Sequence, residues 1–143
     1  MHISFHNTTK ADKTDGEFMR NEQYKSTGIP YETKDGMFYK EILLKVIPEK
    51  LKQLPIDDLV LSEKESKEIE IPFSNFILTL LAKRDQEIEE DADIEFLGKI
   101  YKLQTRSEDR GIWLYIRMYR LLKECLLENK PLYMSLSKDA IDT

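Results

Sequence analysis

The chain has 143 residues, of which 41% are hydrophobic and 34% are charged, and its formal net charge is −5. This length predicts a single domain, and the single cysteine, Cys125, excludes a secreted scaffold held together by its own disulfides. The first residues contain no apolar run of signal-peptide length, and no apolar stretch approaches the ~18 residues that a membrane span requires. We therefore expect a protein of the reducing cytoplasm with no membrane association.

Residues 1–36 are mostly polar and contain three of the five glycines. Such a segment buries little apolar surface, so it predicts an extended arm ahead of a folded domain over residues 37–143. The pair Asp35-Gly36, flanked by β-forming residues, is typical of a hairpin turn at the end of this arm. The arm also carries three spaced aromatic side chains that are candidates for contact with a partner protein: Phe18, Tyr24 and Tyr31.

Residues 38–47 fit two secondary structures. Phe38, Ile42 and Val46 recur with helical spacing, whereas the β-branched residues of the same segment also allow a strand. Pro48 then suits the first turn of a short helix, because the amide proton at that position has no partner within a helix.

The segment 56–71 predicts a second hairpin, with a charged turn between Leu59–Leu61 and Ile69–Ile71. After it, apolar residues at 3.6-residue spacing predict a helix over residues 73–90, with Ser74 as the N-cap.

Residues 94–104 also leave two structures open. The spacing of their apolar residues favours a helix, although Gly98 in the middle of a helix costs about 1 kcal/mol relative to alanine. The positions of Ile94, Phe96 and Ile100 allow a strand instead.

A highly apolar helix is expected from about Gly111 to Asn129, where Asn129 and a following proline end it. It has one ordinary core stripe and a second apolar stripe beside it, so it must be covered on more than one side. It is the central helix of the domain, or its second stripe is an interface with another chain. In the second case the interface candidates are Trp113, Leu114, Met118 and Leu121. Alternating apolar residues in the tail either pack back on the core or join a neighbour's sheet.

Charged residues are segregated in the second half of the chain. Residues 85–95 hold seven acids and no base, and residues 96–123 hold seven bases and two acids. The acidic block lacks the glycine and glutamate spacing of a calcium loop, so it predicts no metal site. The basic block mixes arginine with aromatic residues, as nucleic-acid-binding surfaces do, and pairing with the acidic block would cancel most of its charge. Its candidate contacts are Arg110, Arg117, Arg120 and Lys123.

Other signatures of chemistry are weak. His2 and His6 have a metal-chelating spacing, but no third ligand follows at a suitable distance. They are the only histidines, so a Ser-His-Asp or Cys-His mechanism would have to use one of them. Cys125 lies among leucines, where a thiol is inert, and no glycine-rich phosphate loop occurs. The sequence therefore predicts no catalytic residue, metal or cofactor.

These patterns together predict a compact, mainly helical domain with a small β element, with an α+β fold as the alternative. The expected function is non-enzymatic protein–protein interaction, as a subunit of a larger assembly, an adaptor or an inhibitor. The arm and the last helix would contact a partner protein or a second copy. A nucleic-acid-associated regulator using the arginine patch, and a small enzyme with an unrecognised site, are the alternatives.

Overall fold

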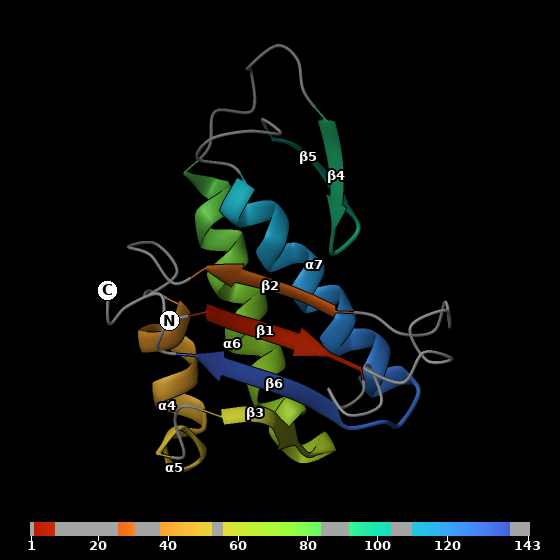
Figure 1. Ribbon diagram of the computed structural model, residues 1–143. Coiled ribbons are helices and arrows are strands. Elements are labelled where there is room, and N and C mark those ends of the chain that lie inside the picture. The colour runs from red at the N-terminus through yellow and green to blue at the C-terminus, as the bar shows by residue number, and fades with distance from the viewer. Residues whose placement is uncertain are drawn as a thin grey trace, which may run out of the picture.

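The computed structural model describes residues 2–7, 26–30, 38–52, 56–83, 92–103 and 110–137. Helices and antiparallel strands together make a mixed α+β fold (Figure 1), the alternative that the sequence left open to a mainly helical domain. In chain order the elements are β1 (His2–His6), β2 (Ser26–Pro30), η1 (Tyr39–Leu43), α4 (Leu44–Val46), α5 (Pro48–Leu51), β3 (Ile56–Leu61), α6 (Glu63–Ala82), β4 (Ala92–Phe96), β5 (Lys99–Leu103), α7 (Arg110–Leu127) and β6 (Leu132–Ser137).

Four antiparallel strands form the main sheet, in the order β2-β1-β6-β3. The two long helices, α6 and α7, lie against one face of this sheet (Figure 1). Alternate side chains of β1 and β6 point to that face, and Ile3, Phe5 and Met134 are fully buried there. The ring of Phe5 meets that of Phe73 on α6 at a centroid distance of 6.4 Å. The core therefore lies between the sheet and the helix pair.

Two strands lie within the segment that the sequence predicts as an extended arm. β1 and β2 fall inside residues 1–36 and pair with each other, and β1 also pairs with β6. Composition hides this arrangement, because the two apolar residues of β1 are buried by elements that lie far away in the sequence, such as β6 and α6. The predicted turn at Asp35-Gly36 lies outside the described residues.

The start of α6 corrects the prediction of a second hairpin. Ser62 caps the helix: its Oγ accepts a hydrogen bond of 3.1 Å from the Glu65 amide, and Glu65 Oε1 accepts one of 3.0 Å from the Ser62 amide. This reciprocal pair is a capping box, so the charged run starts a helix and makes no turn. The prediction of Ser74 as N-cap is also wrong, since Ser74 lies inside α6 and its hydroxyl donates to the Ile71 carbonyl.

Pro72 is accommodated inside α6. A proline in a helix interior costs about 3 kcal/mol, because it removes a main-chain hydrogen bond and crowds the preceding turn. Ile69 and Phe73 on either side are fully buried, and burial of such side chains contributes about 1.5–3 kcal/mol each. Tertiary packing therefore maintains the helix through the proline.

Of the segment 94–104, the described residues 94–103 lie in a hairpin, so the helical alternative is wrong. β4 and β5 pair antiparallel, with Phe96 opposite Lys99. Leu97 and Gly98 between them have φ values of 51° and 81°, as a two-residue type I′ turn requires. Gly98 therefore serves as a turn residue, for which glycine is well suited.

The segment 38–47 is helical and contains a π-turn over η1. The Leu44 amide donates to the Tyr39 carbonyl five residues earlier. The buried residues of this segment are Phe38, Ile42, Leu43 and Ile47. Phe38 and Leu43 are five positions apart, and so are Ile42 and Ile47. The wide turn of η1 lies between Phe38 and Leu43, whereas Ile47 lies beyond it, after α4.

The end of α7 and the following strand follow from local sequence. Asn129 has a φ of 55°, its amide donates to the Leu126 carbonyl, and the Lys130 amide donates to the Cys125 carbonyl at 2.9 Å. This is the hydrogen-bond pattern of a Schellman cap, as the prediction of a helix end at Asn129 requires. The chain then reverses into β6, so the tail packs on the core of its own chain, in the middle of the sheet.

Candidate functional site

Both apolar stripes of α7 are covered within the chain. Of the four interface candidates, Met118 and Leu121 have exposed fractions of 0% and 5%. Trp113 and Leu114 are half-buried and pack against the core. The burial of these four side chains agrees with α7 as the central helix of the domain. The sequence left this possibility open beside that of an interface.

Three elements cover α7. The sheet lies on one side, α6 runs beside it (Figure 1), and the β4–β5 hairpin contacts the middle of the helix at Tyr119 and Arg120. The Tyr119 ring lies 5.8 Å from that of Phe73 on α6 and 5.3 Å from that of Phe96 on the hairpin, between ring centroids. On the second stripe, Met118 and Leu121 are buried inside the protein as well.

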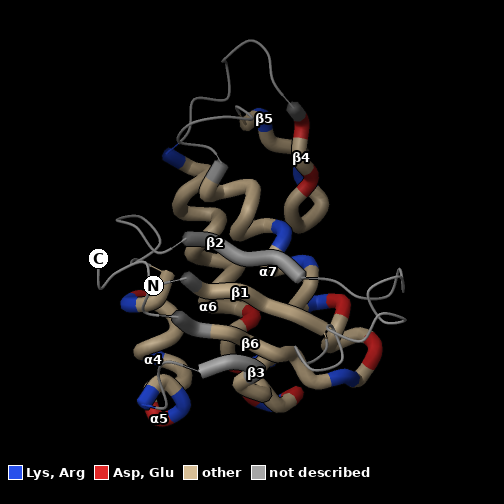
Figure 2. Tube along the Cα trace, in the orientation of Figure 1, with Lys and Arg blue, Asp and Glu red and all other residues tan. Residues whose placement is uncertain are grey.

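Two of the four basic candidates on α7 form ion pairs within the chain. Arg120 Nη2 donates to the main-chain carbonyl of Glu95 at 2.6 Å, and Lys123 Nζ lies 2.5 Å from Glu70 Oε2. The hydrogen bond that Lys123 donates to the Glu70 carboxylate raises the pKa of Lys123. Arg117 is exposed, and the side chain of Arg110 lies outside the described residues. Figure 2 shows basic and acidic residues intermixed along the helices.

The aromatic candidates of the arm, Phe18, Tyr24 and Tyr31, lie outside the described residues. Most of the acidic block 85–95 does so as well. Their predicted roles stay predictions.

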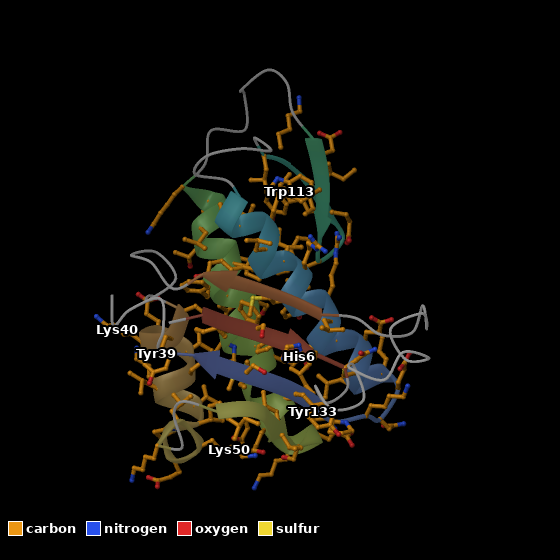
Figure 3. The ribbon with its side chains drawn as sticks, viewed as in Figure 1. His6, Tyr39, Lys40, Lys50, Trp113 and Tyr133 are labelled. Carbon is orange, nitrogen blue, oxygen red and sulfur yellow. The ribbon has the colours of Figure 1, made fainter. Side chains whose placement is uncertain are left out.

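A buried polar cluster joins β1 to β6. His6 Nε2 lies 2.7 Å from Ser135 Oγ and 3.4 Å from Ser4 Oγ, and Figure 3 shows His6 beside Tyr133 on the sheet. His6 and Ser135 are only 2% and 6% exposed, which favours a role in holding the two strands together. Sequence reasoning missed Ser135, because only strand pairing brings together two residues that are 129 positions apart.

Metal ligation by His6 finds no support in the described residues. No group of three or more histidine, cysteine or acidic side chains that could hold a metal ion occurs among them. His6 already lies within hydrogen-bonding distance of a serine hydroxyl.

The β4–β5 hairpin presents two large apolar side chains to solvent. Leu97, in the turn, is 54% exposed, and Ile100, in β5, is 65% exposed. We call these two residues the hairpin tip. Their neighbours across and along the strands, Asp93, Glu95 and Lys99, are exposed charged residues. Charged side chains therefore surround the two apolar ones.

The conformation of Leu97 adds backbone strain at this tip. Its φ of 51° lies in the left-handed region, which costs a residue with a Cβ roughly 1–2 kcal/mol. The neighbouring turn residue, Gly98, donates its amide to Glu95 Oε1 at 2.7 Å. The turn is thus held by Glu95 and Gly98, and nothing in its geometry requires a leucine.

A second surface feature is a groove between the η1–α4 segment and α6, with a volume of about 260 Å³. Buried residues of both segments, Ile42 and Phe76, line it, together with exposed lysines. We call it the η1–α6 groove. The sequence offers no signal for it, since its walls are about 30 positions apart.

Comparison with known proteins finds no match: no protein-family model, no curated protein and no solved structure matches this chain. Within the described part of the chain, none of the helices combines the length and apolar character needed to cross a bilayer.

Proposed function

We propose that this is a non-enzymatic protein-interaction protein, a subunit, adaptor or inhibitor of a larger assembly, which contacts its protein partner through the hairpin tip. The observation that carries the proposal is the exposure of Leu97 in a backbone conformation that leucine disfavours. A cytoplasmic location is part of the same proposal.

Exposed apolar area is the first support. Leu97 and Ile100 project from a hairpin whose other face packs on α7, so a partner can approach them without displacing the core. Removing such side chains from water on binding is favourable by roughly 25 cal/mol per Å² of apolar surface. Asp93, Glu95 and Lys99 would form the polar rim that such interfaces have.

Strain at the turn is the second support. Asparagine or glycine would hold a type I′ turn at lower cost than leucine. Unfavourable backbone conformations concentrate at functional sites, where another requirement selects the residue. Contact between the Leu97 side chain and a partner is such a requirement.

The proposed contact surface is the hairpin tip and no longer the last helix. Met118 and Leu121 are buried within the protein, so they act on a partner only by supporting the fold. Phe18, Tyr24 and Tyr31 stay candidates for a second contact. Nucleic-acid binding is not proposed, because Arg120 and Lys123 are engaged by Glu95 and Glu70.

Substitution of Leu97 by asparagine separates binding from folding. Leu97→Asn creates the preferred Asn-Gly turn, so it should maintain or raise the melting temperature. Combined with Ile100→Thr, which keeps a β-branched residue in the strand, it should abolish co-purification of the partner with the tagged full-length chain from its native cells. Self-association in light scattering should be lost too if the partner is a second copy.

Val60→Thr is the matched control, since Val60 is 44% exposed on β3, in the other sheet. It should retain the partner at wild-type stoichiometry. Retention of every wild-type partner by the folded double variant would overturn the proposal. So would a wild-type protein that binds neither another protein nor itself.

A further inference from the structure

The η1–α6 groove is lined by apolar side chains that belong to or border the core, and by the polar side chains of Asn75 and Thr79. Ile42 and Phe76 line it and have exposed fractions of only 5% and 7%, and Leu80 and Pro72 are half-buried beside them. Its volume of about 260 Å³ is slightly below the ~300–1,000 Å³ of pockets for drug-sized ligands. The groove therefore suits a small ligand with a short apolar portion.

Charged side chains without partners line the rim of this groove. Lys45 and Lys83 stand on its two walls and Glu41 stands beside Lys45. All three are exposed. Within the described ranges none of the three forms an ion pair or a side-chain hydrogen bond, whereas Lys50 and Lys123 are paired with carboxylates. Two bases against one acid make the rim locally positive in a chain of net charge −5.

The π-turn of η1 places this wall of the groove. Glu41 and Ile42 belong to it, and Lys45 follows in α4. π-turns cost stability and occur frequently at functional sites. Here the wide turn buries both Ile42 and Leu43 while Glu41 and Lys45 face the groove.

We infer that the η1–α6 groove binds a small monocarboxylate with a short apolar chain, independently of the hairpin tip. The chain lies against Ile42, Phe76 and Leu80, and the carboxylate lies toward Lys45 and Lys83. One negative charge matches this rim, because a ligand with several anionic groups would bring more charge than two exposed lysines can balance beside Glu41.

Octanoate is a suitable probe, with 1-octanol as the uncharged control of equal chain length. In a titration followed by NMR of the full methyl-labelled chain, octanoate should shift the methyl resonances of Ile42 and Leu80 in a saturable way. The resonances of Val60, on β3, should not move. 1-Octanol should bind more weakly than octanoate. A site that does not saturate, or equal affinity for the two probes, overturns the inference.

Charge substitutions test which groups recognise the carboxylate. Lys45→Gln and Lys83→Gln should each weaken octanoate binding about two- to fivefold, the range expected for exposed charge pairs. Glu41→Gln should strengthen it by a similar factor, because it removes a like charge. Lys64→Gln, on an exposed part of α6 outside the groove, should change nothing.

All four substitutions change exposed side chains, so circular dichroism should show the wild-type fold. Weaker octanoate binding by the folded Glu41→Gln variant would contradict an anionic ligand, since it would assign Glu41 to a cationic group. Unchanged affinity in both folded lysine variants would contradict the assignment of Lys45 and Lys83.

Discussion

Arg120 and Glu95 connect the hairpin to the central helix through the main chain. Arg120 Nη2 on α7 donates a hydrogen bond of 2.6 Å to the carbonyl oxygen of Glu95 on β4, and it lies 3.9 Å from the carboxylate of the same residue. A main-chain acceptor fixes the position of the strand itself. The pair therefore docks the hairpin, and with it the hairpin tip, on α7.

Loss of the Arg120 side chain should loosen the hairpin more than the rest of the fold. Arg120→Ala should lower the free energy of unfolding by about 1 kcal/mol or less, because its side chain is 51% exposed. Hydrogen exchange followed by NMR should show faster exchange of β4 and β5 amides and unchanged exchange in α6. Arg117→Ala, exposed on the same helix, is the control; an equal effect there would contradict a specific docking role for Arg120.

The second stripe of α7 should behave as core. Met118→Ala should lower the free energy of unfolding by about 2–5 kcal/mol, because the side chain is fully buried and its removal leaves a cavity. Leu127→Ala, at the 79% exposed end of the same helix, should change it by about 0.5 kcal/mol or less. Urea denaturation measures both. A loss below about 1 kcal/mol at Met118 would show that the stripe is poorly packed.

Glu65 should make stability depend on pH. Burial raises its pKa, but hydrogen bonds from Lys50 and Ser62 outweigh burial, so its pKa in the folded protein lies below the ordinary value of 4.5. A depressed folded-state pKa stabilises the fold above the unfolded-state value and loses that effect as pH falls through the folded-state value.

Denaturation of wild type and Glu65→Gln across pH 3–7 should test this linkage. The wild-type advantage should be fully present above about pH 5 and should shrink as the pH falls below 4.5, the ordinary value for this group. Glutamine can still accept the hydrogen bond from the Ser62 amide, so the variant keeps the helix cap. A stability difference that does not change with pH would contradict the assignment.

Local signals in the sequence account for much of the secondary structure. The apolar periodicity of α7 and its end at Asn129 can be inferred from the sequence. Gly98 is a turn residue in the structure, although apolar spacing alone favours a helix around it. The capping box of Ser62 and Glu65 was also present in the sequence. The two short apolar runs around this charged segment are also typical of a hairpin, so the pattern favours the wrong element there.

The candidate sites were much less predictable. Leu97 is exposed because it lies in the turn of a hairpin, and a positive φ at a leucine leaves no mark on composition. The η1–α6 groove forms only where two helical segments come into contact. One of them contains a π-turn, which the spacing of apolar residues does not predict. The neighbours of His6 come from a strand at the other end of the chain.

By itself, the sequence determined that this chain cannot form an intrachain disulfide and that its last helix must be covered on more than one side. Caps, turns and helical faces depend on contacts within a few residues, so they can be inferred from short patterns. Only the tertiary structure decided that the chain's own sheet, α6 and hairpin cover α7, and that β1 pairs with β6. Such pairing brings together segments that are distant in sequence, and burial depends on every element that packs nearby.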